Sequence, residues 1–270
     1  MVFSEKTGFQ APSPGLLFPL YIYPAPGAWD FLHEAIHAHP RLNFTIVINP
    51  GSGPGPLPLP DANYAREIPR LASKPNVRIL GYIACTWAAK PLASVLGELA
   101  TYAQWRSKCP SLGVQGVFLD EAPSEYDPRT VRYLETINAT IKASEGMEEG
   151  LFVPSGQLTS TAVMNPGVFP DSRYMALADV TVVFEDTHRQ FSRLDCAKSL
   201  KELAKTHRSR NCVLMHSITD SSERHLEHLV DQLHDVVGFL FLTDLSSGFY
   251  ASKSVSFPRT LDALSRRLPA

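Results

Sequence analysis

The sequence lacks the marks of several common protein classes. Its 270 residues carry a formal net charge of −2 and no run of lysine or arginine, which argues against a nucleic-acid partner. No apolar stretch approaches the roughly 20 residues that span a bilayer, so we expect no transmembrane segment. Residues 1–10 lack the charged-then-apolar layout of a secretory signal, so we expect a cytoplasmic protein unless a signal has been removed.

Cysteine is scarce and scattered, at Cys85, Cys109, Cys196 and Cys212. These four residues form no C-x-x-C pair and have no histidine at zinc spacing, so buried reduced thiols are favoured over a disulfide framework. His33 and His37 lie at i and i+4 and could chelate a metal, but a solvated helix face explains them as well. We therefore expect no metal and no cofactor.

Motifs for phosphate binding and for serine or zinc hydrolysis are also missing. The glycine-rich segment 51–55 is interrupted by a proline, and no G-K-[ST] follows it, so it does not predict a phosphate cradle. The chain contains no G-x-S-x-G elbow and no H-E-x-x-H motif.

Eight apolar segments alternate with amphipathic segments along the chain. The segments that predict strands are 17–23, 44–49, 78–84, 116–120, 151–154, 180–185, 212–217 and 238–243. Those that predict helices are 29–39, 62–72, 93–107, 128–144, 191–206, 222–234 and 256–267, with a short helix near 174–178. Apolar strands alternating with helices specify a parallel sheet covered on its outer face. We therefore predict an α/β fold, a single (β/α)8 barrel domain over residues 1–270 with residues 1–13 loosely ordered, and a doubly wound open sheet is the alternative.

Two of these predicted strands end in adjacent acids. Asp120 is the last residue of the segment 116–120 and Glu121 follows it. Glu185 is the last residue of the segment 180–185 and Asp186 follows it. Acids are poor strand formers and costly to bury, so their place is the carboxyl end of a strand, where barrel enzymes keep their active sites. Each acid alone could instead cap a helix or pair with an arginine. Acids on two strands of one barrel favour the carboxylate pair of a glycoside hydrolase.

Polar and aromatic residues at other strand ends complete a predicted substrate-binding rim. They are Tyr21, Tyr23, Asn49, Tyr82, Trp87 and His216. At a period of two, Tyr21 and Tyr23 share a face that we expect to point into the barrel mouth, while His216 could equally be part of a structural wall. This rim suits a neutral polyhydroxylated ligand, whose ring faces stack on aromatic side chains and whose hydroxyls bond amides and carboxylates. We expect a polysaccharide or oligosaccharide substrate and a monomeric protein.

Five segments, read in order, resemble the spherulin-4-like family, glycoside hydrolase family 135. They are LFPLYIYPA at 17–25, INPGSGPG at 48–55, RILGYIA at 78–84, GVFLDEA at 116–122 and VVFED at 182–186. The resemblance covers the chain from about Pro14 to Asp244. It implies a (β/α)8 barrel that hydrolyses α-1,4-linked N-acetylgalactosamine in the fungal polysaccharide galactosaminogalactan, and it carries the family's acidic residues onto Asp120, Glu121 and Glu185. Family members are typically secreted or membrane-anchored, and this chain shows neither feature.

By analogy with other retaining α-glycosidase barrels, Asp120 is assigned as nucleophile, Glu185 as acid/base and Glu121 as an orienting neighbour. The enzyme expected on this basis is an endo-acting α-N-acetylgalactosaminidase. A non-catalytic carbohydrate-binding barrel is the main alternative. A barrel lyase or isomerase that uses metal-binding carboxylates is a further one.

Overall fold

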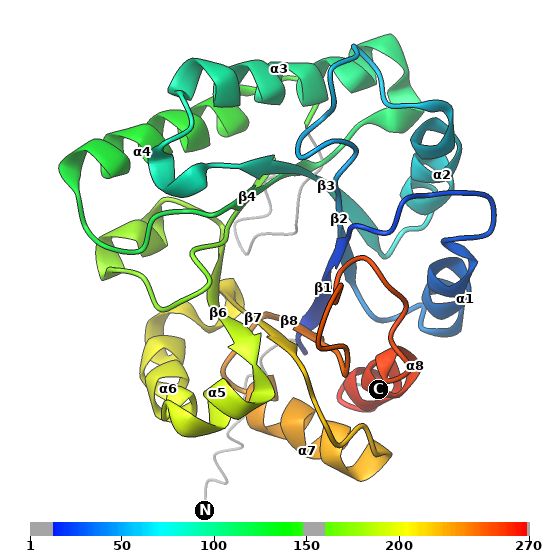
Figure 1. The fold of residues 1–270 in the computed structure, drawn as a ribbon, viewed down its shortest axis with the longest axis vertical. Coiled ribbons are helices and arrows are strands. Elements are labelled where there is room, and N and C mark those ends of the chain that lie inside the picture. Colours follow the sequence, from blue (N-terminus) through cyan, green and yellow to red (C-terminus); the bar gives the residue numbers. More distant parts are fainter. Residues whose placement is uncertain (1–12, 148–159, 269–270) are drawn as a thin grey trace, which may run out of the picture.

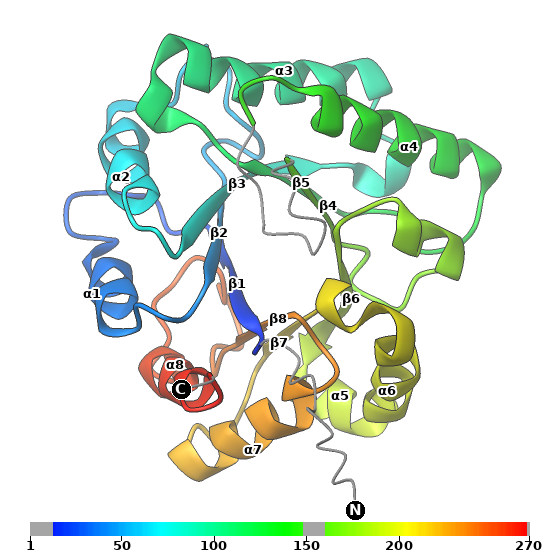
Figure 2. The same cartoon turned by 180° about the vertical axis from the view of Figure 1, so that it is seen from behind.

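Eight parallel strands form a closed barrel that helices surround (Figure 1). The computed structural model describes residues 13–147 and 160–268. Within them the strands follow one another around the barrel in chain order, and β8 pairs with β1 to close it. Figure 2 shows the same ring of helices from behind. The predicted (β/α)8 fold is confirmed, and the open sheet is wrong because it would leave β1 and β8 unpaired.

The elements alternate as the sequence pattern requires. The strands are β1 Gly15–Leu20, β2 Phe44–Ile48, β3 Val77–Ala84, β4 Gly116–Asp120, β5 Thr161–Met164, β6 Val180–Thr187, β7 Asn211–His216 and β8 Phe239–Leu242. The helices are α1 Asp30–Ala38, α2 Ala62–Ala72, α3 Leu92–Lys108, α4 Pro128–Ala143, α5 His188–Arg193, α6 Cys196–His207, α7 Glu223–His234 and α8 Phe257–Ser265. Short 3-10 turns lie at η1 Thr86–Ala88, η2 Pro110–Leu112, η3 Ser172–Ala176 and η4 Arg208–Arg210. None of the described helices combines the length and the apolarity needed to cross a bilayer.

Burial explains why these segments take these forms. Every residue of β1, β2, β5 and β8 is buried, as expected for strands covered on both faces. Helices bury only one face: in α2 this face contains Tyr64, Ile68 and Leu71, at helical spacing. The carboxylates of Asp61 and Asp127 accept hydrogen bonds from the first free backbone N–H groups of α2 and α4, which fixes where these helices begin.

Close packing between β3 and α3 depends on a glycine. A Cβ atom at Gly81 would lie 2.5 Å from the ring of Tyr102, so only glycine permits this approach. The hydroxyl of Tyr102 in turn donates a hydrogen bond of 3.1 Å to the carbonyl of Tyr82. These contacts with Tyr102 of α3 therefore fix the position of the carboxyl end of β3.

The first strand, the predicted helix segment 191–206 and the fifth strand have bounds other than those expected from the sequence. Strand β1 ends at Leu20, because its pairing with β2 stops there and the N–H of Tyr21 donates to the carbonyl of Tyr250 instead. The predicted helix 191–206 is two helices, because Asp195 adopts the left-handed conformation (φ 45°) between α5 and α6. The fifth strand is Thr161–Met164, whereas the predicted strand 151–154 and residues 1–12 lie outside the described residues.

Candidate active site

The carboxyl ends of three neighbouring strands bring two acids and an amide together in the barrel mouth. Asp120 ends β4, Asn165 follows β5, and Glu185 lies near the end of β6. The Nδ2 atom of Asn165 donates to Oδ1 of Asp120 at 2.7 Å and to Oε2 of Glu185 at 2.5 Å. One side-chain amide therefore connects the two acids.

Two tyrosines bind the remaining oxygens of this acid pair. The hydroxyl of Tyr82 donates to Oδ2 of Asp120 at 2.9 Å, and that of Tyr250 donates to Oε1 of Glu185 at 2.7 Å. The ring of Tyr21 meets both tyrosine rings edge-on, at centroid distances of 5.4 and 5.5 Å. Burial, and after it the charge of the neighbouring acid, raises the pKa of Tyr82 and of Tyr250 well above the usual value. Both phenols therefore stay neutral and act as donors.

A β-bulge turns Glu185 toward the mouth. The register between β6 and β7 shifts between Val182 and Phe184. Phe184 packs against Phe191 of α5 with ring centroids 5.2 Å apart, so it belongs to the layer between barrel and helices. The next side chain, Glu185, points to the other side of the strand. Bulges next to active sites re-aim side chains in this way.

The two acids sit in different electrostatic environments. Burial raises the pKa of Glu185, the hydrogen bonds from Tyr250 and Asn165 lower it, and the charge of Asp120 raises it again, with a net shift above the usual value. The oxygens of Asp120 accept hydrogen bonds from Tyr82, from Asn165 and from the N–H of Glu121 at 2.9 Å. Glu185 thus retains a proton more readily than an ordinary glutamate. Both oxygens of Asp120 accept hydrogen bonds from neutral donors.

Glu121 adopts a strained backbone conformation beside this pair. Its φ of 52° lies in the left-handed region, which non-glycine residues rarely occupy. Its carbonyl accepts a hydrogen bond of 2.7 Å from the N–H of Trp87. The charge of Glu121 contributes to the raised pKa of Tyr82, so its carboxylate lies within electrostatic reach of the pair.

Two predicted rim residues lie away from the acids. The hydroxyl of Tyr23 donates to Asp61 at 3.2 Å and accepts from Asn63 at 2.7 Å, which places this tyrosine at the start of α2. The expectation that Tyr23 shares the face of Tyr21 is wrong, because β1 ends before either residue and the strand alternation stops with it. The side-chain oxygen of Asn49 accepts from the N–H of Gly53 at 3.1 Å, so this amide braces the glycine-rich loop.

His216 lies at the end of β7 among aromatic rings. Its imidazole stacks on Phe249 with centroids 4.2 Å apart, and Nδ1 lies 2.9 Å from the hydroxyl of Ser217. Burial lowers the pKa of His216, with the charge of Asp186 opposing that shift. Phe249 also meets the ring of Tyr250 edge-on, with centroids 4.6 Å apart. Through Phe249, His216 therefore packs against the loop that carries Tyr250, the hydrogen-bond donor to Glu185.

Sequence reasoning missed Asn165 and Tyr250. The run TAVMN at 161–165 has the same pattern as the other strands, an apolar stretch that ends in a polar residue, but the fifth strand was expected at 151–154. Tyr250 lies well beyond β8 in the connection to α8, and it reaches the mouth because its carbonyl accepts from the N–H of Tyr21 at 2.9 Å. A local pattern carries no signal for such a contact.

The described histidines and cysteines outside the mouth give no sign of a metal site. His33 lies 3.0 Å from the buried carboxylate of Glu67, which accounts for it without a metal. Across residues 13–147 and 160–268, no three His, Cys, Asp or Glu side chains gather in a way that could hold a metal ion. The four cysteines form no disulfide.

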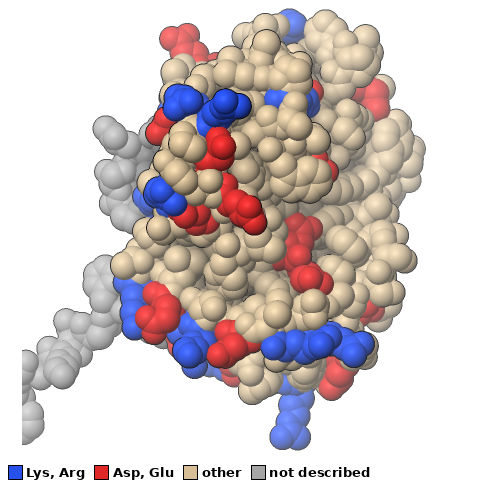
Figure 3. Space-filling model, turned by 60° about the vertical axis from the view of Figure 1, so that its left-hand side comes forward, with Lys and Arg blue, Asp and Glu red and all other residues tan. Residues whose placement is uncertain are grey.

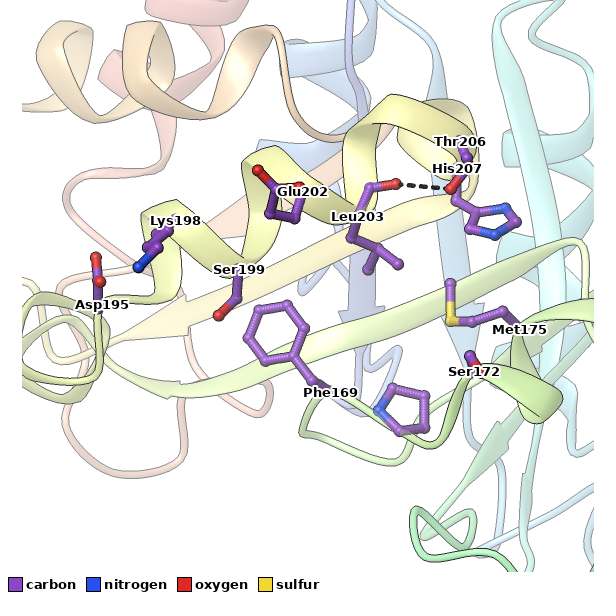
Figure 4. Close-up of a pocket in the computed structure, with 11 residues that line it drawn as sticks. Phe169, Ser172, Met175, Asp195, Lys198, Ser199, Glu202, Leu203, Thr206 and His207 are labelled. Atoms are coloured by element: carbon purple, nitrogen blue, oxygen red, sulfur yellow. Dashed lines mark hydrogen bonds between the residues drawn. The ribbon is translucent and has the colours of Figure 1, made fainter.

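A groove on the outside of the barrel is another candidate binding site. It has a volume of about 730 Å³ and lies between the β5–β6 connection and α6 (Figure 4). Phe169, Met175 and Leu203 form its apolar part, and Lys198 and Glu202 lie on α6 at its edge. It contains none of the strand-end acids, so the barrel mouth remains the candidate active site.

Comparisons with known proteins agree with this architecture. Spherulin-4 of Physarum polycephalum is 29% identical over 240 residues, which make up 86% of this chain and 64% of that protein, so the match spans less than two thirds of that relative. The crystal structure of Aspergillus clavatus Sph3 in complex with GalNAc superposes with a TM-score of 0.86 at 41% identity, over 94% of this chain and 98% of that one. Residues 15–264 match spherulation-specific family 4. The chain therefore belongs to this family, the spherulin-4-like family that the sequence motifs indicated.

Proposed function

We propose that the protein is a retaining glycoside hydrolase that cleaves α-1,4-linked N-acetylgalactosamine within a polysaccharide. The observation that carries this proposal is the amide of Asn165 shared by Asp120 and Glu185. Since one nitrogen contacts both acids, the two bonded oxygens lie at most about 5 Å apart, which matches the roughly 5–5.5 Å of retaining enzymes and not the 6.5–9.5 Å of inverting ones. Such a spacing favours direct attack of one carboxylate on the anomeric carbon over attack by a water molecule that this carboxylate activates.

The environments of the two acids support distinct roles. Asp120, held by three donors, is the nucleophile: its carboxylate attacks the anomeric carbon and forms a glycosyl–enzyme ester. Glu185, with its raised pKa, gives its proton to the leaving oxygen. The Glu185 carboxylate then takes a proton from water, which hydrolyses the ester and restores both acids. Glu121 tunes the charge of the pair and orients Asp120 through its backbone N–H.

The chemistry of the proposed substrate also requires an enzyme nucleophile. In an α-linked 2-acetamido sugar the acetamido group lies cis to the leaving oxygen, so it cannot attack from behind the anomeric carbon. Two displacements at that carbon then give a product with the α configuration of the substrate. Asp120 supplies the group that the substrate itself cannot.

Similarity to a ligand complex supports the choice of substrate class. Sph3 of Aspergillus clavatus, which is 41% identical to this chain, was solved with GalNAc. In the mouth of this barrel, the aromatic rings of Tyr21, Tyr82 and Tyr250 surround the acids. Aromatic walls with a few converging polar groups suit a sugar ring.

Product analysis tests this proposal. The protein is incubated with purified galactosaminogalactan and, separately, with neutral α- and β-linked glucans, and the products are resolved by mass. We expect shorter oligosaccharides from galactosaminogalactan alone, and none from any polymer with the Glu185→Gln variant. Binding of galactosaminogalactan without cleavage by the wild-type protein would instead favour a carbohydrate-binding barrel.

A further inference from the structure

Exposed large apolar side chains gather at one end of the barrel. Within the described residues, all of them except Leu194 lie in connections that leave the carboxyl end of a strand, on the same side as Asp120 and Glu185, whereas Leu194 lies between α5 and α6. Three of those in the strand-end connections are aromatic, Tyr23, Trp87 and Tyr126, and the others are aliphatic and follow β2, β5 and β8. Single exposed apolar residues are ordinary, but their concentration on one face indicates a binding surface.

Trp87 is the most exposed of these aromatic residues and has an unusual backbone. Its side chain is 63% exposed, whereas Trp29 and Trp105 are 1% and 0% exposed. Three consecutive non-glycine residues adopt the left-handed conformation here, with φ values of 49° at Thr86, 50° at Trp87 and 66° at Ala88. Left-handed residues are costly for L-amino acids and normally occur singly. A strained run of this kind persists only where the surrounding structure holds it, and such runs cluster at ligand-binding sites.

Backbone hydrogen bonds tie this turn to the acids. The N–H of Trp87 donates to the carbonyl of Glu121 at 2.7 Å, and that of Cys85 donates to the carbonyl of Asp120 at 2.8 Å. On its far side, the hydroxyl of Tyr133 donates to the carbonyl of Lys90 at 3.0 Å. The indole of Trp87 is therefore carried on a turn fixed directly to the residues that end β4. An exposed indole with no binding role would not need a turn that is hydrogen-bonded to the backbone of Asp120 and Glu121.

We propose that Trp87 is a stacking platform for a sugar unit of the polymer that neighbours the unit bound at Asp120 and Glu185. The identity of the polymer rests on the function proposed above. A pyranose offers an apolar face to an indole and hydroxyls around its edge. The carbonyl of Glu121 accepts the hydrogen bond from the N–H of Trp87, so this acid adjoins the turn that carries the indole. The platform adds affinity for longer chains and leaves the bond-breaking step unchanged.

Fluorescence tests the platform independently of hydrolysis. Because Trp29 and Trp105 are buried, iodide is expected to quench mainly Trp87. We titrate the Glu185→Gln variant, which does not degrade its ligand, with N-acetylgalactosamine and with α-1,4-linked oligomers of increasing length. Longer oligomers should shift the emission to the blue and protect it from iodide, and the monosaccharide should do neither.

Kinetics supply the second test. In the active enzyme, Trp87→Ala should raise KM for the polymer about three- to tenfold, the range expected for one aromatic contact, with kcat and the hydrolysis of a short aryl glycoside unchanged. Trp87→Phe should recover part of the loss. The matched control Leu194→Ala changes an exposed apolar residue between α5 and α6, which is 60% exposed, and should leave KM as in the wild type. Melting temperatures identify any variant that fails to fold. In that case the iodide experiment, which uses a protein that retains Trp87, tests the platform without the kinetic data.

The outcomes separate the two proposals. Polymer hydrolysis with an unchanged KM in Trp87→Ala and no protection from iodide would overturn the platform and leave the hydrolase. Protection of Trp87 without any hydrolysis by the wild type would keep the platform and overturn the hydrolase. Oligomers that neither protect Trp87 nor are cleaved would overturn both.

Discussion

Asp120 and Glu185, from different strands, share one hydrogen-bond donor, the side-chain amide of Asn165. Two carboxylates this close repel each other when both are ionised, and the charge of Asp120 is one of the causes that raise the pKa of Glu185. The amide fixes their separation while donating to both. A single residue that follows β5 thus sets the spacing of the two acids on which the proposed mechanism depends.

Removing the proton of Glu185 should stop hydrolysis without stopping binding. Glu185→Gln keeps the size of the side chain, but it loses the proton that the leaving oxygen needs, so the rate should fall by about 10²–10⁴. The affinity for oligosaccharides and the melting temperature should stay close to wild type. Initial rates on the polymer and binding isotherms measure both quantities, and a rate above about a tenth of wild type would remove Glu185 from the acid/base role.

Matched variants define the boundary of the site. Asp120→Asn should lose activity to a similar extent as Glu185→Gln, because an amide cannot form the glycosyl ester. Asp186→Asn should retain most activity, since Oδ1 of Asp186 accepts a hydrogen bond of 2.6 Å from the N–H of Thr187 and so serves the local backbone. An inactive Asp186→Asn with wild-type stability would show that the site extends further than proposed here.

The alkaline limb of the pH profile should report Glu185. Its pKa lies above the usual value, so the protonated form persists above pH 4.5, and activity should fall as pH rises through this shifted pKa. The hydrogen bond from Asn165 lowers that pKa, so Asn165→Ala should move the alkaline limb to higher pH. It should also lower kcat by on the order of 10² because the two acids lose their fixed spacing. A limb that stays in place in Asn165→Ala would mean that another group controls it.

Salt should weaken the turnover of a cationic form of the polymer. The hydrogen bonds to Asp120 come from neutral donors, so they do not offset its negative charge, and the carboxylate of Glu121 adds to that charge. On the face of the molecule that Figure 3 shows, acidic and basic side chains are interspersed. Partly deacetylated galactosaminogalactan is positively charged, so its KM should rise between low and high ionic strength, with little change for the fully acetylated polymer. Equal salt responses of the two polymers would contradict an acidic mouth.

A buried carboxylate should make α2 sensitive to acid. Glu67 contacts His33 of α1 at 3.0 Å and Arg66 and Arg70 at 2.8 and 2.7 Å. Burial alone would raise the pKa of Glu67, but hydrogen bonds from Arg66 and His33 and the charge of Arg70 outweigh it and hold the pKa below the usual value. The stability that this gives is present above the unfolded-state pKa and is lost as pH falls through the folded-state pKa.

Glu67→Gln should therefore lower the free energy of unfolding at pH 7 by about 1.5–3 kcal/mol, and by less at acidic pH. Urea denaturation at the two pH values measures the difference. The exposed pair of Glu202 and Lys205, also at 2.7 Å, is the control, and Glu202→Gln should change the free energy by less than about 0.5 kcal/mol. A loss in Glu67→Gln that does not depend on pH would show that packing, not charge, matters there.

The sequence predicted the parts of this structure that local patterns encode. Apolar runs that end in acids placed Asp120 and Glu185 at the correct ends of β4 and β6, because strand burial and the cost of buried charge are properties of neighbouring residues. Asn165 was missed because the fifth strand was expected at 151–154, whereas β5 is the short apolar run Thr161–Met164 that precedes Asn165. Tyr250 and the position of Tyr23 depend on where β1 stops pairing and on which loop it then contacts. Those are long-range contacts, and a single sequence does not encode them locally.

The anomeric configuration of the first product tests the central claim most directly. Proton NMR follows the reducing ends released from galactosaminogalactan in the first minutes, before mutarotation mixes them. Double displacement at Asp120 with Glu185 as acid/base predicts that α-configured ends appear first and that Glu185→Gln releases none. First release of β-configured ends, or no release by the wild-type protein, would contradict the account.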